Sequence, residues 1–392
     1  MKDLEKLSFE NTKTAFQILD DKELKKAKRL FKMVASRFLL KMGKIFLPLA
    51  LATRLPVSWA VKGIYNYFVA GETIKSADRL AQKLSIYNVK SIPDYSVEGK
   101  GSEESFLNVK NELLYAIELI AASKDMPFAV FKPSGMAPFS VLEKVSAGIE
   151  LNTEEETSYE GIREKWDVVF AAGAAKNVPV LVDAEESWIQ KALDDLLMEF
   201  SLKYNTETPI VWNTFQMYRH DRLELLRKQI EFAREKGIKL GYKFVRGAYW
   251  EKENKYAAGK GIISAVYQKK EETDAAYDEA MKICFENRDI VHFMNASHNE
   301  ESNYYLAEMM LSHKIDTADP GIWFAQLLGM SNHITFNLAE QCFNVAKYVP
   351  YAPLRKVMPY LLRRAEENSS MRGQTGRELA LIEKEMDRRK TI

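Results

Sequence analysis

The sequence has only two cysteines, Cys284 and Cys342, among its 392 residues. That number excludes a disulfide framework and a cysteine-based metal site, and it indicates a reducing, intracellular setting. An excess of charge of either sign is also missing, because 56 Lys and Arg residues stand against 55 Asp and Glu residues. The net charge therefore gives no reason to expect a nucleic acid or an acidic polymer as a partner.

Signals for export and for membrane crossing are missing near the start of the chain. Residues 1–20 alternate charged and polar side chains with single apolar ones, unlike a signal peptide. The longest apolar run that follows, Ile45–Ala52, is far shorter than the roughly 20 residues of a spanning helix. We therefore expect a cytoplasmic protein.

The stretch Lys22–Lys44 is rich in basic residues, and apolar residues interrupt it at helical spacing. This pattern is typical of a surface helix packed on the main domain. It also fits an amphipathic helix on an anionic membrane surface. The second interpretation would make the protein peripheral on the inner face of the membrane. If membrane binding by this basic stretch were the protein's whole function, the protein would be a non-catalytic module of the membrane surface.

From Tyr87 onward, short apolar runs alternate with helical stretches. The runs are typical of strands buried on both faces. The eight candidate strands are Val89–Tyr95, Phe128–Lys132, Val180–Glu185, Ile210–Gln216, Leu240–Arg246, Val291–Ser297, Ile322–Leu328 and Val345–Tyr348. Their alternation with helices implies a parallel sheet, and eight units predict a closed (βα)8 TIM-type barrel. A doubly wound open sheet is the alternative.

This α/β interpretation divides the chain into three parts. We predict an N-terminal helical extension over residues 1–85, and the barrel over residues 86–375. The barrel part ends in a helix over the barrel mouth. A polar helix or tail occupies residues 376–392.

Polar residues stand where most of the candidate strands end. They are Asp94, Lys132, Asp183, Glu185, Gln216, Arg246, Ser297, His298, Gln326 and Tyr348. Any one of them could simply begin a loop. In a barrel of this type, however, the carboxyl ends of the strands build the active site, so together they predict a site for a large polar ligand.

The glycine-rich motifs that cradle phosphates are missing, which argues against a Rossmann dinucleotide site. A dinucleotide would need side chains and strand-end amides instead, and Arg246-Gly247-Ala248 suits that purpose. Two alternatives stay open. Asp183, Glu185 and His298 could ligate a metal, although a metal site is not our prediction. Lys132 could form a Schiff base in a barrel lyase.

Near the C-terminus, Tyr360, Arg363, Arg364 and Glu367 share one face of a predicted helix. Arginine and glutamate at this spacing usually form an exposed, salt-bridged face. Two adjacent arginines can also clamp a carboxylate with paired charge-assisted hydrogen bonds. A helix that follows the last strand packs beside the barrel mouth, which favours the second interpretation.

Six segments together resemble the proline dehydrogenase family, flavoenzymes of the first step of proline catabolism. They are Phe68–Thr73, Leu181–Glu185, Phe244–Trp250, Ala296–Asn299, Lys347–Tyr351 and Tyr360–Arg364 with Glu367-Asn368. They occur in the family's order, and Ala296-Ser297-His298-Asn299 is similar to the eukaryotic-like branch.

The resemblance implies a role for each matching residue. Arg363 and Arg364 would hold the proline carboxylate with Lys132, and Tyr360 would line the pocket. Asp183 would join the catalytic ion-pair network, and Tyr348 would cover the proline ring. The residues implied to contact FAD are Ala184, Gln216, Arg246, Gly247, Ala248, Ser297, His298 and Glu367. Lys243 stands where many bacterial members carry an arginine close to the reactive part of the flavin; the lysine keeps the charge but lacks the planar fork of a guanidinium group.

The implied reaction is hydride loss from the ring carbon of L-proline to flavin N5, which gives 1-pyrroline-5-carboxylate. In this family a membrane quinone is commonly the electron acceptor. The chain has no room for a fused aldehyde dehydrogenase, so we expect a monofunctional enzyme with a separate pyrroline-5-carboxylate dehydrogenase as partner. Oxidation of 4-hydroxyproline is the alternative, but Tyr348 favours proline, because relatives that prefer the hydroxylated ring tend to have a smaller residue there.

Overall fold

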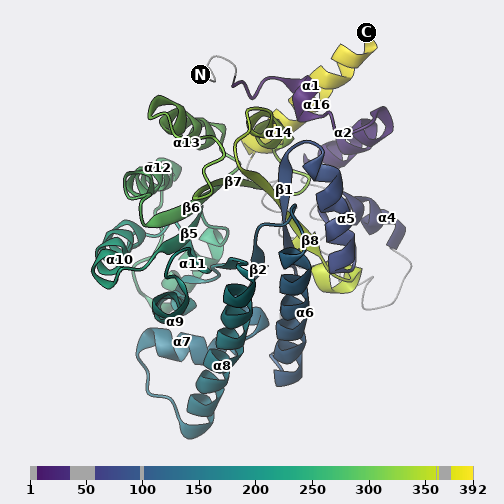
Figure 1. Ribbon diagram of the computed structural model, residues 1–392. Helices are drawn as coiled ribbons and strands as arrows, with labels where there is room; N and C mark the ends of the chain where they lie inside the picture. Colours follow the sequence, from purple (N-terminus) through teal and green to yellow (C-terminus); the bar gives the residue numbers. More distant parts are fainter. Residues whose placement is uncertain (1–6, 36–57, 98–100, 359, 362–371, 392) are drawn as a thin grey trace.

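The computed structural model describes residues 7–35, 58–97, 101–358, 360–361 and 372–391. They contain a closed barrel of eight parallel strands in sequence order (Figure 1). The strands are β1 (Val89–Tyr95), β2 (Ala129–Phe131), β3 (Val180–Val182), β4 (Val211–Gln216), β5 (Leu240–Val245), β6 (Val291–Ala296), β7 (Ile322–Leu327) and β8 (Val345–Tyr351). β8 closes the barrel by pairing with β1 from Val89↔Val345 to Tyr95↔Tyr351. The predicted barrel is confirmed, and the open-sheet alternative is wrong.

Both faces of the strands are apolar. Ile92, Leu181, Trp212, Met294 and Ala346 belong to a buried cluster inside the barrel. Their neighbours in the strands point outward and join the larger core between the barrel and its helices. Burial on both faces explains why the strands appear in the sequence as nearly continuous apolar runs.

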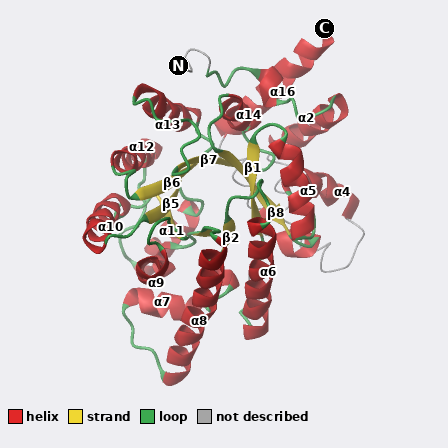
Figure 2. Cartoon of the chain, viewed as in Figure 1, coloured by secondary structure: helices red, strands yellow, loops and turns green. Residues whose placement is uncertain are grey.

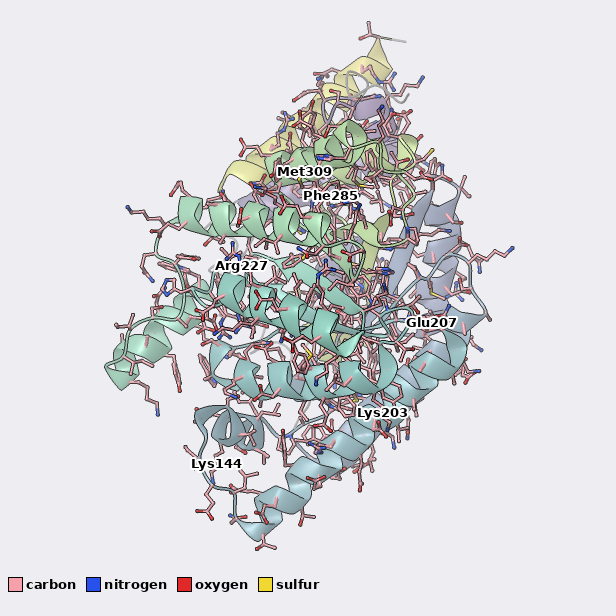
Figure 3. All side chains as sticks on the ribbon, turned by 60° about the vertical axis from the view of Figure 1, so that its left-hand side comes forward. Lys144, Lys203, Glu207, Arg227, Phe285 and Met309 are labelled. Atoms are coloured by element: carbon pink, nitrogen blue, oxygen red, sulfur yellow. The ribbon has the colours of Figure 1, made fainter. Side chains whose placement is uncertain are left out.

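Helices surround the barrel, as Figures 1 and 2 show. Those after β1 to β7 are α6 (Glu103–Ala121), α7 (Phe139–Ala147), α8 (Thr153–Lys176), α9 (Ser187–Tyr204), α10 (Arg222–Lys236), α11 (Trp250–Lys260), α12 (Lys270–Glu286), α13 (Glu300–Ser312) and α14 (Asn332–Glu340). A 3-10 turn, η2 (Pro133–Gly135), follows β2. Figure 3 labels Lys203, Arg227, Phe285 and Met309 on α9, α10, α12 and α13.

The outer position between β8 and β1 is filled by α5 (Ile74–Ser85), which precedes the first strand and contacts both. The chain after β8 takes a different course. Met358 and Tyr360 are buried in one cluster with Val97 and Met330. Val97 follows β1 and Met330 follows β7, so this segment lies at the carboxyl ends of the strands. The same cluster includes Phe68 from α4 (Ser58–Phe68).

The two ends of the chain pack together. α1 (Thr12–Ala15) and α2 (Asp21–Ala35) contact α16 (Arg372–Lys390). Leu24, Ala27 and Phe31 of α2 are buried against Leu381 and Ile382 of α16. The apolar face of α2 is therefore covered by protein. Among the described residues, no helix has the length and apolar character that crossing a bilayer requires.

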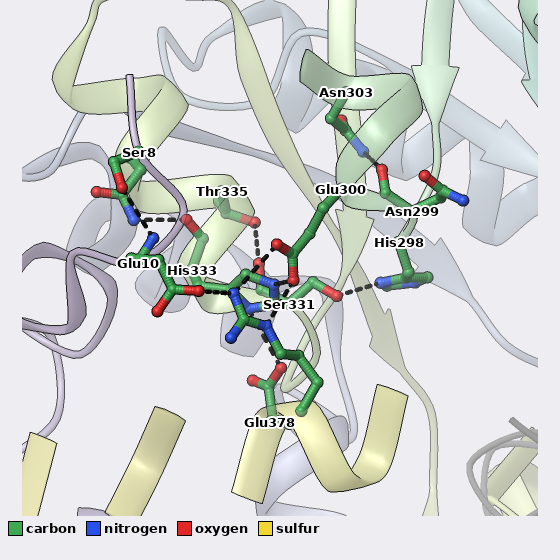
Figure 4. A network of polar contacts seen from close by, with 12 residues as sticks. Ser8, Glu10, His298, Asn299, Glu300, Asn303, Ser331, His333, Thr335 and Glu378 are labelled. Carbon is green, nitrogen blue, oxygen red and sulfur yellow. Dashed lines mark hydrogen bonds and ion pairs between the residues drawn. The ribbon is translucent and has the colours of Figure 1, made fainter. Parts of the chain in front are cut away.

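Ion pairs fix α16 to the barrel helices (Figure 4). Arg377 donates to Glu300 at 2.8 Å. His333 of α14 lies between Glu300, at 3.0 Å, and Glu378 of α16, at 3.4 Å. Burial opposes the charged imidazole, but the two carboxylates outweigh it and raise the pKa of His333.

Gly241 is the glycine of the barrel wall that tolerates a side chain least. A Cβ on Gly241 would lie 2.5 Å from the ring of Trp212, and Trp212 is fully buried. We expect Gly241→Ala to lower the free energy of unfolding by about 1–3 kcal/mol, because overpacking forces a rigid ring to move. Urea denaturation measures the effect. Gly259→Ala is the control, since no atom outside its own stretch of helix would lie within 4 Å of the added Cβ; equal losses in both variants would contradict the explanation.

Candidate active site

The alternation of side chains along the strands sorts the polar strand ends into two groups. On β8, Ala346 and Tyr348 belong to the inner cluster, and on β7 Ala325 does. By the same alternation, Asp94, Lys132, Asp183, Gln216, Lys243 and Tyr348 face the inside of the barrel. Arg246, Ser297 and Gln326 face outward, toward the helices.

Five of the inward-facing side chains form one continuous network of ion pairs and hydrogen bonds. The Lys132 ammonium donates to both carboxylate oxygens of Asp94, at 2.8 and 2.9 Å. It also lies 3.5 Å from Asp183. On its other side, Asp183 accepts a hydrogen bond from Lys243, which also donates to the Tyr348 hydroxyl at 2.9 Å. Five side chains from β1, β5, β8 and the ends of β2 and β3 thus form one network.

The charges in this network stabilise one another. Burial alone would raise the pKa of Asp183, but Lys243 and Lys132 outweigh it and hold that pKa below its usual range. The ionised Asp183 therefore stabilises the folded protein at pH values above the ordinary carboxyl pKa. This stabilisation is lost as the pH falls through the lowered pKa of Asp183. Burial, with Asp183 and Asp94, raises the pKa of Tyr348 well above its usual value. At neutral pH the network therefore holds Asp183 as a carboxylate and Tyr348 as a neutral phenol.

Asp94 is the network member to which the sequence alone assigned no role. It is buried, and it also accepts a hydrogen bond from Ser96 at 2.6 Å. The signal was present in the sequence, because Asp94 lies one residue before the end of a strand. What the sequence could not show is that its partner would be Lys132, 38 residues further on.

The outward group serves the surrounding helices. Arg246 donates to Asp274, Ser297 and Ser302 at 2.6, 2.7 and 2.9 Å. The Gln326 amide donates to the Ser297 carbonyl at 3.2 Å and accepts from Thr335 at 2.7 Å. Arg246, Ser297 and Gln326 therefore do not point into the barrel with the other polar strand ends as expected, because their places in the alternation turn them outward.

Two buried polar atoms at the end of β4 have no hydrogen-bond partner among the described residues. They are Oε1 of Gln216 and the hydroxyl of Tyr218. Gly247 lies against the Tyr218 ring with a φ of 120°, and a Cβ there would lie 2.6 Å from that ring. Buried polar groups normally have partners, so this corner is suited to a polar ligand. Ala184 is half-buried and Ala248 is exposed.

Neither chemical alternative to a flavin site is assembled. Glu185 accepts from Ser134 at 2.7 and 2.8 Å, His298 contacts Ser331, and Asp183 pairs with lysines. In the part of the chain that the structure describes, no group of three acidic, histidine or cysteine side chains is placed to hold a metal ion. Burial raises the pKa of Glu185 to about 7.

Lys132 lies between two carboxylates. This arrangement suits an ammonium ion rather than the free amine that a Schiff base needs.

Four predicted site residues belong to the helix expected near the C-terminus: Arg363 and Arg364 for the proline carboxylate, Tyr360 for the pocket wall and Glu367 for FAD. Tyr360 is buried over the carboxyl ends of the strands. Arg363, Arg364 and Glu367 lie outside the described residues.

A family model described as proline dehydrogenase matches residues 77–377, well over half of the chain. The chain belongs to the proline dehydrogenase family. The resemblance seen in the sequence is thereby confirmed. Proline dehydrogenase 1, mitochondrial, of Dictyostelium discoideum is 31% identical over 379 residues, which cover 85% of this chain and 66% of that protein. Hydroxyproline dehydrogenase of Xenopus laevis is 30% identical, with 95% and 88% covered.

Solved structures are similar in fold. Proline utilization A (PutA) from Bdellovibrio bacteriovorus, inactivated by N-propargylglycine, superposes with a TM-score of 0.72 at 19% sequence identity. The match covers 91% of this chain but 38% of the PutA chain. This proline dehydrogenase family member thus spans slightly less than two thirds of the Dictyostelium protein, and much less of PutA.

Proposed function

We propose that this protein oxidises L-proline to 1-pyrroline-5-carboxylate with FAD as cofactor. The observation that carries the proposal is the buried network of Asp94, Lys132, Asp183, Lys243 and Tyr348 inside the barrel mouth of a proline dehydrogenase family member. When bound, FAD supplies the hydride acceptor at its N5 atom.

The residues at the end of β4 fit a flavin. Gln216 donates to the Glu185 carbonyl at 2.9 Å and keeps a buried acceptor without a partner. Such an acceptor matches the N–H group of an isoalloxazine ring. Gly247 has a positive φ, and the Tyr218 ring occupies the place where a Cβ would lie, so only glycine fits there. The proposed FAD contacts are Ala184, Gln216, Arg246, Gly247, Ala248, Ser297, His298 and Glu367.

The network supplies the charges that the substrate needs. We assign the proline carboxylate to Lys132, Arg363 and Arg364, whose charges and donors complement it. Hydride loss leaves positive charge on the ring C–N bond. The Asp183 carboxylate, held ionised by two lysines, provides fixed negative charge where that cation develops. Tyr348 and Tyr360 would enclose the ring and exclude water.

The experiment that tests the proposal is proline-dependent reduction of an artificial dye by the purified, flavin-loaded protein. Yellow protein with flavin absorbance and dye reduction that requires proline is the expected result. Colourless protein that cleaves a substrate through Lys132 would support the lyase instead.

Preference between proline and 4-hydroxyproline follows from the space beside Tyr348. Its ring is buried and its hydroxyl is fixed by Lys243, which leaves little room for a hydroxyl on the substrate. We expect kcat/KM to be higher for proline, and Tyr348→Ser to shift the ratio toward hydroxyproline by about tenfold, a usual discrimination for a small change in pocket shape. Steady-state kinetics with both substrates measure the ratio. Tyr348→Phe, which keeps the ring, should not shift it toward hydroxyproline.

We further propose that a quinone-type acceptor reoxidises the flavin, and that a separate pyrroline-5-carboxylate dehydrogenase consumes the product. A peripheral membrane contact would bring the enzyme to the quinone. Since the apolar face of α2 is covered by α16, the contact would be electrostatic, through the exposed Lys22, Lys25, Lys26 and Arg29.

Reversal of these four charges to glutamate should weaken binding to anionic vesicles at least tenfold, because each basic residue near the surface adds attraction. Vesicle co-sedimentation measures the binding, with neutral phosphatidylcholine vesicles as the control. Binding that survives the reversal would contradict the contact.

A further inference from the structure

Ser331, just before α14, has an unusual backbone conformation. Its φ is 50° and its ψ is 45°, in the left-handed region. Residues with a Cβ rarely adopt this conformation unless the surrounding structure enforces it.

The loop between β7 and α14 is fixed from two sides. The Ser331 carbonyl accepts from the backbone N–H groups of Ile334 and Thr335, both at 3.1 Å. Lys347 of β8 donates to the carbonyl of Leu327 at 3.3 Å, and to that of Met330 at shorter range. Lys347 points out of the barrel and is 1% exposed. A buried amino group is costly unless it is hydrogen-bonded, so these carbonyls and Lys347 hold each other in place.

The conformation brings the Ser331 hydroxyl to 2.9 Å from Nδ1 of His298 (Figure 4). Ser331 is buried, and its hydroxyl makes no other hydrogen bond among the described contacts. A buried hydroxyl has one hydrogen to donate, and an unprotonated Nδ1 can accept it. The hydrogen of the neutral imidazole is then on Nε2, because the bond at one ring nitrogen sets the state of the other.

We propose that Ser331 is a positioning residue for the flavin. Its hydroxyl donates to Nδ1 of His298 and fixes the imidazole as the Nε2–H tautomer, which donates a hydrogen bond to an acceptor atom of FAD. Lys347 acts one step further away, by holding the loop that carries Ser331. The inference rests on the proposed FAD contact of His298.

The tautomer can be measured without flavin or substrate. The chain has five histidines, so ¹⁵N labelling of histidine gives few signals, and loss of one set in His298→Gln assigns His298. In the flavin-free protein we expect an unprotonated Nδ1 and a protonated Nε2. A protonated Nδ1 would overturn the proposal. Because this measurement needs no cofactor, it tests the tautomer of His298 independently of whether the protein oxidises proline.

Two substitutions of Ser331 separate the hydroxyl from the backbone. Ser331→Ala and Ser331→Gly both remove the hydroxyl, but glycine adopts a positive φ without strain. We expect both variants to bind FAD about 3–10 times more weakly, the usual effect of one lost hydrogen bond. Fluorescence titration of the apoprotein with FAD measures the affinity. Wild-type affinity in Ser331→Gly would show that the hydroxyl is not needed and would overturn the proposal.

A matched control exists on the surface. Ser312 also contacts a histidine Nδ1, that of His313, at 3.2 Å. Ser312→Ala should leave FAD affinity unchanged. Lys347→Met should change the His298 signals as Ser331→Ala does, although Lys347 touches neither residue. Unchanged His298 signals in folded Lys347→Met protein would remove Lys347 from the proposal.

Discussion

Asp183→Asn is expected to lower kcat for proline oxidation by roughly 10²–10³-fold, the usual effect of removing one preorganised charge at a reacting centre. Asp183 lies between the ammonium groups of Lys132 and Lys243. The amide keeps the shape of the side chain but removes the charge that offsets both lysines and stabilises the developing cation. Steady-state kinetics of the flavin-loaded variant measure the loss.

Stability must be measured alongside this variant. Removing one partner of a buried ion pair costs about 3–5 kcal/mol in unfolding free energy, and the 17% exposure of the Asp183 side chain places the effect at the lower end. Asp195→Asn is the control, since Asp195 forms an exposed pair with Lys191 on α9. If folded, flavin-loaded Asp183→Asn turned over at the wild-type rate, the assigned role would be wrong.

Arg364→Met is expected to raise the KM for proline by about 30- to 1000-fold, which corresponds to about 2–4 kcal/mol for leaving a charged partner unpaired. The physical reason is the loss of a bidentate partner for the substrate carboxylate, which a single ammonium such as that of Lys132 replaces poorly. Arg364 lies outside the described residues, so this prediction rests on the sequence motif.

Arg163→Met provides the comparison for that measurement. Arg163 forms exposed pairs with Glu160 and Glu199 on the outer helices, so its loss should leave the KM unchanged. An Arg364→Met enzyme with the KM of the wild type would refute the carboxylate clamp.

Much of the barrel could be predicted from the sequence. Each candidate strand overlaps an observed one, because burial on both faces leaves apolar runs that local inspection detects. The boundaries were less accurate. β3 ends at Val182, three residues before the expected Glu185, and β8 extends to Tyr351, three beyond Tyr348. A strand ends where pairing with its neighbours stops, and that depends on the rest of the sheet.

The site was harder to predict because orientation depends on strand register. Asp183, Lys132 and Tyr348 were recognised, and the structure brings them into one network. Gln326 was expected among them but faces the helices, since a shift of one residue reverses the direction of a side chain.

Ser331 and Lys347 were missed for a different reason. A positive φ and contacts across the β7–α14 loop leave no local pattern in the sequence. Such features arise from tertiary contacts that only the assembled barrel supplies.

The most direct test of the account is an anaerobic titration of the flavin-loaded protein with L-proline, followed by flavin absorbance. The account predicts that proline removes the absorbance of the oxidised flavin in a saturable manner and that 1-pyrroline-5-carboxylate appears in equal amount. A protein that retains no flavin after reconstitution, or whose flavin remains oxidised at saturating proline, would contradict the account.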